Sequence, residues 1–201
     1  VFDQCWSQTN ILLNEILDYS AASKGGEFVD ATFGAGGYSR AILEKSAQNK
    51  IYAFDRDESV KNIALKLEQE FPHRFEFFHD RFSNIKSRLE QNNINNLKGI
   101  IFDLGVSSMQ LDNADRGFSF NKRAKLDMRM GLNDINAKDV INDFSEEDLA
   151  DIIYNFGEER SSRRIARFIC KARSEAEILY TDQLADIVAV SYTHLTLPTK
   201  A

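Results

Sequence analysis

Cysteine, proline and glycine are scarce in this chain of 201 residues, which has two, two and ten of them. Cys5 and Cys170 are too few and too far apart for a disulfide-stabilised secreted module. The low glycine and proline content excludes collagen-like and proline-rich linker proteins. No apolar run approaches the roughly 20 residues that span a bilayer, and the first residues lack a secretion signal. We therefore expect a cytoplasmic protein without a membrane partner.

An excess of positive charge is also missing, because 25 Lys and Arg face 31 Asp and Glu and give a net charge of −6. This balance argues against bulk non-specific binding to nucleic acid, although a local basic face remains compatible with it. The histidines His73, His79 and His194 lack metal-ligand spacing with the cysteines, so we predict no metal site. The 43% hydrophobic and 28% charged residues are typical of a globular chain.

The first part of the chain alternates strand-like and helix-like segments, which predicts an α/β fold with a doubly wound parallel sheet. Apolar segments bounded by glycine, acidic or polar residues indicate four strands, at 27–31, 50–54, 75–79 and 99–104. Helical spacing of apolar residues indicates helices at 10–17, at 38–45, from 59 onward and at 85–89.

After about Gln110 the pattern changes to a polar stretch, 112–130, and then to helices. Ser145 to Asp148 resembles a capping box. The apolar residues that follow share one face and are expected to be buried, namely Leu149, Ile152, Ile153 and Phe156. Gly157 is expected to end this helix in a left-handed conformation, with a second helix at 158–172 and a third capped by Thr181. Residues 190–201 do not fit this pattern and are interpreted as a non-native tail, or alternatively as a loop or edge strand.

The glycine-rich loop Gly34-Ala35-Gly36-Gly37 lies between the first strand and a helix, with Asp30 at the strand end. Asp55 ends the next strand, about 20 residues later, where a carboxylate can accept both hydroxyls of a ribose. This pairing suits either a dinucleotide or S-adenosylmethionine. The spacing G-x-G-G favours S-adenosylmethionine, because a dinucleotide loop has the spacing G-x-G-x-x-G. A tight turn without a ligand is the third interpretation.

Two further segments are expected at the same edge of the sheet, because ligands of open α/β sheets bind outside the carboxyl ends of the strands. Phe82 follows the third strand and can lie against an adenine ring, or else pack in the core. Asp103 lies near the end of the fourth predicted strand.

A row of cations runs through the second predicted helix. Because a helix turns by about 100° per residue, the spacing of these cations places them within one narrow arc of its surface. The row comprises Arg160, Arg163, Arg164, Arg167 and Lys171. The row predicts a face that contacts phosphates, or a solvated face partly paired with Glu158 and Glu159. Cations of the polar stretch could extend it, and Phe118 and Phe120 are candidate stacking partners for a base. These cations are Arg116, Lys122, Arg123, Lys125 and Arg129.

Several long motifs resemble those of the bacterial small-subunit ribosomal RNA cytosine-N4 methyltransferases. They are VDATFGAGGYSRAIL, AFDRD, RFSN, DLGVSSMQLD, DRGFSF, LDMRM and YNFGEERSSRRIAR. The resemblance implies a Rossmann-like S-adenosylmethionine-dependent methyltransferase sheet interrupted by an inserted helical domain. On it we expect the first part of the methyltransferase domain at 1–111 and an incomplete inserted domain at 112–189. The remaining strands of the sheet are expected beyond the present chain.

By the same resemblance, the residues that bind S-adenosylmethionine are Gly36, Gly37, Tyr38, Asp55, Phe82, Asp103 and Gln110. The chain departs from the family pattern at Gln8 and Tyr38, where histidine is common, and at Met109, where proline is common. Asp103 is also the candidate acceptor for the reacting amine, with Ser107 and Ser108 as hydrogen-bonding neighbours.

The implied reaction is methyl transfer to the N4 amine of a cytosine in the decoding region of 16S ribosomal RNA. Positioning of the amine in line with the methyl group can supply about 7–11 kcal/mol of barrier lowering. The alternatives are an NAD-type oxidoreductase and a non-catalytic RNA-binding module. We expect the chain alone to be weak or inactive. Its oligomeric state is left open, a homodimer included.

Overall fold

The computed structural model describes residues 12–119, 122–132 and 135–193. These residues form two compact units, each with its own core. The first unit contains residues 12–107 together with Met130–Leu132, and the second contains the other described residues between 108 and 193. Among the described residues, no helix combines the length and apolar character needed to cross a membrane.

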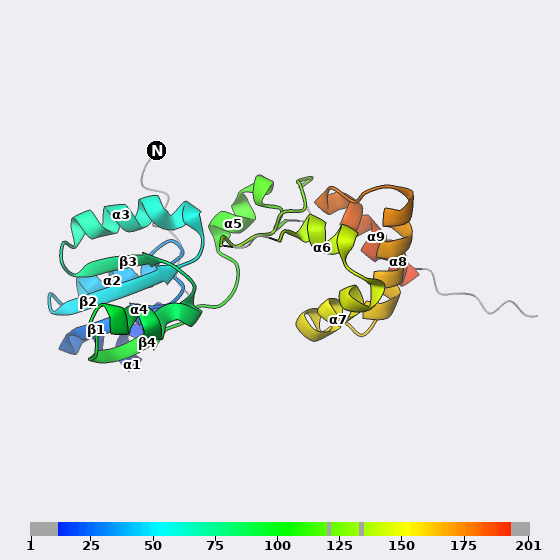
Figure 1. The fold of residues 1–201 in the computed structure, drawn as a ribbon. Helices are drawn as coiled ribbons and strands as arrows, with labels where there is room; N and C mark the ends of the chain where they lie inside the picture. Colours follow the sequence, from blue (N-terminus) through cyan, green and yellow to red (C-terminus); the bar gives the residue numbers. More distant parts are fainter. Residues whose placement is uncertain (1–11, 120–121, 133–134, 194–201) are drawn as a thin grey trace, which may run out of the picture. The chain divides into compact units, whose positions relative to one another are not determined.

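The first unit is a four-stranded parallel sheet in the order β3-β2-β1-β4, which confirms the predicted α/β class. Helices lie on both faces of the sheet (Figure 1). The strands are β1 (Gly26–Asp30), β2 (Asn49–Asp55), β3 (Phe75–His79) and β4 (Leu97–Ile101). The α-helices of this unit are α1 (Leu13–Tyr19), α2 (Gly37–Lys45), α3 (Lys61–Glu70) and α4 (Ile85–Gln91). Short 3-10 helices occur at η2 (Ala22–Lys24), η3 (Glu58–Val60) and η4 (Phe82–Asn84).

Alternation along the strands distributes apolar side chains to the two faces of the sheet. Val29, Tyr52 and Phe54 pack against Ile85 and Leu89 of α4. Strand β4 is shorter than expected, because it ends at Ile101 rather than at Leu104. The amide of Asp103 donates to the Thr32 hydroxyl, at 2.8 Å, and so leaves the ladder that β4 forms with β1.

The second unit is helical, and in Figure 1 its colour runs from green at α5 to red at α9. They are α5 (Ser108–Asp112), η5 (Ala114–Arg116), α6 (Ala137–Asp143), α7 (Glu146–Gly157), α8 (Ser162–Glu175) and α9 (Thr181–Thr193). Its core joins Leu126 and the apolar faces of these helices, including Leu149, Ile165 and Ile169. Cys170 packs against the edge of this core, as expected of a small hydrophobic side chain.

Capping explains where two of these helices begin. The Ser145 hydroxyl accepts from the Asp148 amide at 3.0 Å, which confirms the predicted start of α7. Helix α6, which the sequence pattern did not reveal, begins at a reciprocal capping box. The Asn136 side chain accepts from the Asp139 amide, at 2.9 Å, and the Asp139 carboxylate accepts from the Asn136 amide, at 3.1 Å.

Three predicted details of the helical part are wrong. Glu158, not Gly157, takes the left-handed conformation, with φ 52°, because its amide still bonds the Ile153 carbonyl. The next helix begins at Ser162 rather than 158, since the Ser161 amide bonds the Glu159 carboxylate at 2.5 Å and forms a turn. Thr181 is the first residue of α9 rather than its cap, and its hydroxyl accepts from the Ala124 amide at 3.2 Å and donates to the Lys122 carbonyl at 2.8 Å.

Residues 190–193 belong to α9, and Ser191 is fully buried, so the alternative interpretation as a loop or edge strand is wrong for these four residues. The remainder of the segment at 190–201 lies outside the described residues, as do Cys5, Gln8, Phe120 and His194.

Candidate functional site

The glycine-rich loop of the first unit is held in place by Asp30, a fully buried carboxylate at the end of β1. One carboxylate oxygen accepts from the Ser39 hydroxyl at 2.7 Å, and the other from the Thr32 amide at 3.3 Å. Burial raises the pKa of Asp30 to about 6, although these two hydrogen bonds oppose the increase. Asp30 therefore joins the loop to the first turn of α2 and supports the site without reaching its surface.

Gly36 can be no other residue without rearrangement of the loop. Its φ is +79°, and a Cβ atom at this position would lie 2.8 Å from the Phe33 ring. Because α2 begins at Gly37, the first amides of the helix have no acceptor within the helix. The loop thus brings backbone N–H groups and a close backbone approach to the carboxyl end of the sheet, which suits an anionic or carboxylate-bearing ligand.

Asp55, at the end of β2, meets this loop directly. One of its carboxylate oxygens accepts from the Gly34 amide at 2.8 Å, and the other accepts from the Asp57 amide at 2.9 Å. Burial raises the pKa of Asp55, and the backbone amides partly offset the increase. The Arg56 amide also hydrogen-bonds this carboxylate, but a carboxylate has about four lone-pair sites, so the group can still accept a hydrogen bond from a ligand hydroxyl. The structure brings the predicted loop and the predicted acid together.

Asp103 and Tyr38 also meet beside the loop. The amide of Asp103 bonds Thr32, and the Tyr38 hydroxyl donates a hydrogen bond to the Asp103 carboxylate. The pKa of Tyr38 is raised, first by burial and then by the negative charges of Asp103 and Asp30. Asp103 lies in an exposed segment after β4, so its carboxylate is accessible to a ligand while Tyr38 restrains it.

Phe82 follows β3 and is 46% exposed, so the interpretation of this residue as core packing is wrong. Its ring meets Phe102 edge to face, with the ring centroids 5.8 Å apart. Phe102 is itself 51% exposed and was not singled out in the sequence, although it directly precedes Asp103. Two exposed rings at this end of the sheet offer apolar faces to a planar ligand group.

The other predicted ligand residues follow this segment in the chain. Ser107 is the last residue of the first unit before the chain enters the second, where Ser108 and Gln110 belong to α5. The Gln110 side chain is buried in the second unit. Their roles toward a cofactor stay predictions.

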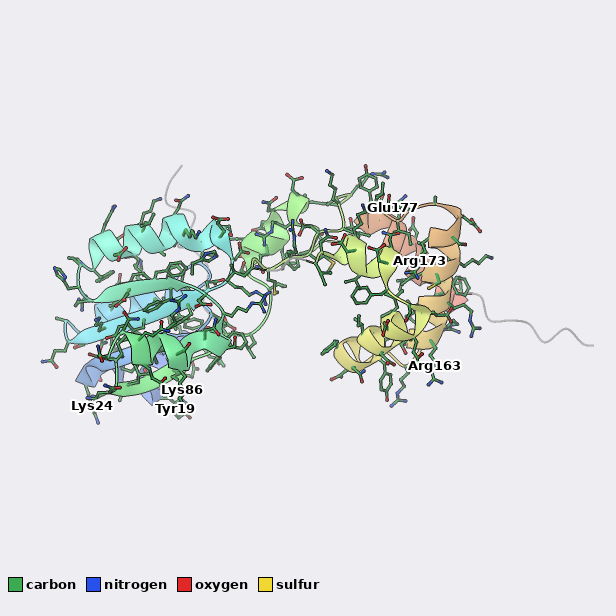
Figure 2. The ribbon with its side chains drawn as sticks, in the orientation of Figure 1. Tyr19, Lys24, Lys86, Arg163, Arg173 and Glu177 are labelled. Atoms are coloured by element: carbon green, nitrogen blue, oxygen red, sulfur yellow. The ribbon has the colours of Figure 1, made fainter. Side chains whose placement is uncertain are left out.

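The row of cations is divided by the way α8 begins and packs. Arg160 precedes the helix and is not part of its arc, because α8 starts at Ser162. Arg164 is half-buried and its guanidinium lies 5.7 Å from the centre of the Tyr192 ring. One side of α8 exposes three cations that follow each other at intervals of four residues, namely Arg163, Arg167 and Lys171. Arg163 is labelled in Figure 2.

The acidic neighbours interact with only part of this row. The Glu159 carboxylate accepts from the Tyr192 hydroxyl at 2.6 Å and from the Ser161 amide at 2.5 Å. Arg167 lies 3.8 Å from Glu146, whereas Arg163 and Lys171 form no ion pair with any residue in the described part of the chain.

The cations of the polar stretch are mostly committed inside the second unit. Arg123 pairs with Asp182 at 3.1 Å and lies 4.0 Å above the Tyr180 ring. Arg129 forms a two-point contact with Asp127, at 2.8 and 2.7 Å. Arg116 lies 5.8 Å from the Phe118 ring centre. Among the described residues of the predicted rim, Lys122 and Lys125 are exposed and form no ion pair or ring contact.

Comparison with known proteins gives two findings. A family model described as the MraW methylase family matches residues 6–200. The chain is also similar to proteins named ribosomal RNA small subunit methyltransferase H. That of Wolbachia sp. subsp. Drosophila simulans (strain wRi) is 52% identical over 183 residues, which cover 90% of this chain and 62% of that protein. That of Ehrlichia ruminantium (strain Gardel) is 47% identical over 182 residues, covering 90% and 60%. The chain therefore spans about 60% of the length of these relatives.

Proposed function

We propose, from the premise that this chain belongs to the MraW methylase family, that it is part of an enzyme that methylates 16S ribosomal RNA with S-adenosylmethionine. More specifically, the acceptor is the exocyclic N4 amine of a cytosine in the decoding region. The observation that carries the proposal is the joint placement of Asp55 and the glycine loop, in which the Gly34 amide donates to the Asp55 carboxylate at 2.8 Å.

The residues of the first unit fit S-adenosylmethionine group by group. Asp55 accepts the ribose hydroxyls, the exposed Phe82 ring contacts the adenine, and the loop at Gly36 and Gly37 admits the backbone close to the methionine part. Tyr38, Asp103 and Gln110 complete the proposed cofactor set. We assign no cofactor-binding role to Asp30, because its two carboxylate oxygens accept hydrogen bonds from Ser39 and Thr32.

The cofactor, when bound, supplies a methyl group attached to a positively charged sulfur, which is a good leaving group because it becomes a neutral thioether when the methyl group is transferred. The cytosine amine is a weak nucleophile because its lone pair is shared with the ring, so the protein must orient it and accept its N–H. Asp103 is the proposed acceptor, because its carboxylate is exposed and is held by the Tyr38 hydroxyl. Ser107 and Ser108 are proposed as its hydrogen-bonding neighbours. Such positioning acts by placing the amine and methyl carbon in line.

We propose that residues 1–111 belong to the methyltransferase domain and that residues 112–189, most of which lie in the second unit, form an inserted domain. Its RNA-contacting residues are proposed to be Arg160, Arg163, Arg164, Arg167 and Lys171. Arg163, Arg167 and Lys171 are the strongest members, since they are exposed along one side of α8.

Binding of S-adenosylhomocysteine, measured by isothermal titration calorimetry, tests the cofactor assignment. We expect binding of S-adenosylhomocysteine and none of NADH, and an Asp55→Asn variant to bind about 10- to 100-fold more weakly, because hydrogen bonds to a charged acceptor are lost. Glu90→Gln, on the exposed side of α4, is the matched control. Binding of NADH alone would establish the oxidoreductase alternative. RNA binding without either ligand would establish the non-catalytic module.

We also propose that this chain alone transfers methyl groups weakly. Strand β4 is the outermost strand of the sheet, and Ile100 within it and Phe102 directly after it are about half exposed, which leaves an unpaired strand and apolar side chains open to self-association. Methyl incorporation into small-subunit particles, compared with that of a chain of the relatives' full length, measures the difference. Equal rates for the two chains would contradict this proposal.

A further inference from the structure

The end of α7 carries an aromatic ring that the fold leaves uncovered. Leu149 and Phe156 are seven residues apart and so lie on the same side of the helix. Leu149 is 1% exposed in the core of the second unit, whereas Phe156 is 85% exposed. The expectation that Phe156 is buried is therefore wrong. Helix α7 continues its apolar side past the point where the core of the unit covers it.

An exposed ring by itself is common at protein surfaces and carries no function. The surroundings of Phe156 are what distinguish it. The turn that follows α7 folds back onto the helix, because the Glu159 amide bonds the Ile153 carbonyl at 3.4 Å. Arg160 lies in this turn and Arg163 in the first turn of α8, and both are exposed. An uncovered ring and two cations thus share the corner where α7 joins α8.

The cations at this corner have no internal function that would account for them. Among the residues that the structure describes, neither Arg160 nor Arg163 forms an ion pair. The nearest carboxylate along the chain that could neutralise them, that of Glu159, is held by Tyr192 and Ser161. Glu158 is exposed in the same turn, but the exposed cations continue from this corner along α8 as Arg167 and Lys171, so in a protein with a net charge of −6 this row complements an anionic partner.

Together these features match the chemistry of unpaired nucleic acid. Single-stranded RNA presents base faces that stack on aromatic rings and phosphates that contact arginine. A duplex hides its base faces, so it would use the arginines but not the ring. We infer that the α7–α8 corner, formed by Phe156, Arg160 and Arg163, binds single-stranded RNA by stacking one base on Phe156. This inference rests on the proposed function, for which it names the form of RNA that is held and a residue that holds it.

Fluorescence anisotropy with a short unstructured RNA, and with the duplex of the same sequence, tests the inference in the present chain. Phe156→Leu keeps an apolar side chain but removes the stacking face. We expect it to weaken single-strand binding about 5- to 100-fold, the range for loss of one stacked base, and to leave duplex binding unchanged. Phe156→Trp should restore the affinity.

The salt dependence separates the two kinds of contact. Phe156→Leu should leave the slope of log affinity against log salt unchanged, whereas Arg163→Gln should reduce it by about 0.7, the value for one phosphate of a single strand. Tyr154→Leu is the matched aromatic control, because Tyr154 is exposed on the same helix but two residues away, on another side. Lys86→Gln, an exposed lysine of α4, controls for loss of charge.

Several results would overturn the inference. Unchanged single-strand affinity in Phe156→Leu would exclude stacking, and equal losses for the Tyr154 and Phe156 variants would exclude a defined site. Self-association that disappears in Phe156→Leu, seen by sedimentation, would mean that a second copy covers the ring. Calorimetry with S-adenosylhomocysteine on the same variants keeps the outcomes apart. Intact cofactor binding with no effect of Phe156 rejects the corner alone, whereas absent cofactor binding in the unsubstituted chain rejects the proposed function.

Discussion

The carboxylates of Asp30 and Asp55 in the first unit and the exposed cations of α8 in the second unit are held in opposite ways. In the first unit, both oxygens of Asp30 and both oxygens of Asp55 accept hydrogen bonds from within the fold. In the second unit, Arg163 and Lys171 are exposed on α8 and form no ion pair with other described residues.

This difference matches the ligands proposed for the two units. A small ligand needs groups that are oriented before it arrives, because each side chain that must be ordered on binding weakens affinity. The backbone of the glycine loop provides that order for Asp55. A phosphate chain needs accessible positive charge with little geometric restriction, and exposed arginines provide it.

The first unit also includes residues 130–132, which follow most of the polar stretch in the sequence. Arg56 directly follows Asp55 in the chain. Two nitrogens of its guanidinium, Nε and Nη2, each donate to the Gly131 carbonyl at 3.3 Å. Arg81 donates to the carbonyl of Leu132. These contacts attach residues 130–132 next to the candidate ligand site.

The largest effect is expected for Gly131→Ala. Gly131 has φ +85°, and a Cβ atom there would overlap the Arg56 carbonyl oxygen, which is backbone and cannot move aside. We expect a loss of about 4 kcal/mol in the free energy of unfolding, from left-handed strain and the overlap together. Urea denaturation measures the loss.

The matched control is Gly157→Ala, at a helical position where a Cβ atom would meet nothing within 4 Å. This variant should be neutral, or more stable by about 0.5–1 kcal/mol. If the two alanine variants behave alike, the close approach of residues 130–132 to Arg56 does not matter for the first unit.

Within the second unit, Leu149→Ala and Phe156→Ala should differ although both shorten the same side of α7. Leu149 is fully buried, so its truncation should cost about 3 kcal/mol through lost burial and a cavity. Phe156 is exposed, and its truncation should change the free energy of unfolding by less than about 0.5 kcal/mol. Chemical denaturation of both variants tests the pair. A large loss for Phe156→Ala would show that a neighbour covers it in solution.

The buried carboxylate of the first unit should produce a specific pH dependence. The pKa of Asp30 rises from 3.8 to about 6 on folding, so ionisation of Asp30 makes the folded state less stable as pH increases through this window. The penalty is absent below about pH 3.8 and complete above about pH 6, where it amounts to about 3 kcal/mol. Asp30→Asn can keep both hydrogen bonds without the charge.

We therefore expect Asp30→Asn to match the unsubstituted chain near pH 4 and to gain stability relative to it up to pH 7, as measured by urea denaturation across this range. The matched control is Asp80→Asn, because hydrogen bonds from Arg88 and Asn84 lower the pKa of Asp80 against its desolvation. That variant should be less stable than the unsubstituted chain by an amount that stays nearly constant between pH 4 and 7, because the lowered pKa of Asp80 confines its pH dependence to below about pH 3.8. A pH-independent difference for Asp30→Asn would contradict the assigned pKa.

The smallest effect is expected at the capping box of α6. Asn136→Ala removes the side chain that accepts from the Asp139 amide and should cost about 1 kcal/mol. Thermal denaturation measures the change. Asn155→Ala, at an exposed position of α7, is the control and should change stability very little.

Much of the first unit could be predicted because its signals are local. The alternation of strands and helices, the glycine loop and the position of Asp55 each depend on residues close in the chain. The meeting of Asp55 with Gly34, 21 residues away, followed from a general rule of parallel sheets, in which consecutive strands end at the same edge. Phe102 was missed because a phenylalanine at a strand end has the same pattern whether it is buried or exposed.

The sequence alone determined the fold class, the ends of β3 and the start of α7, since each depends on short-range periodicity and capping. Only the tertiary structure decided that Phe156 is exposed while Leu149 is buried on the same side of α7. It also decided that Glu159 bonds Tyr192 rather than the cations of α8. Both outcomes depend on which elements pack against each other, and helical spacing describes the side of a helix without stating what covers it.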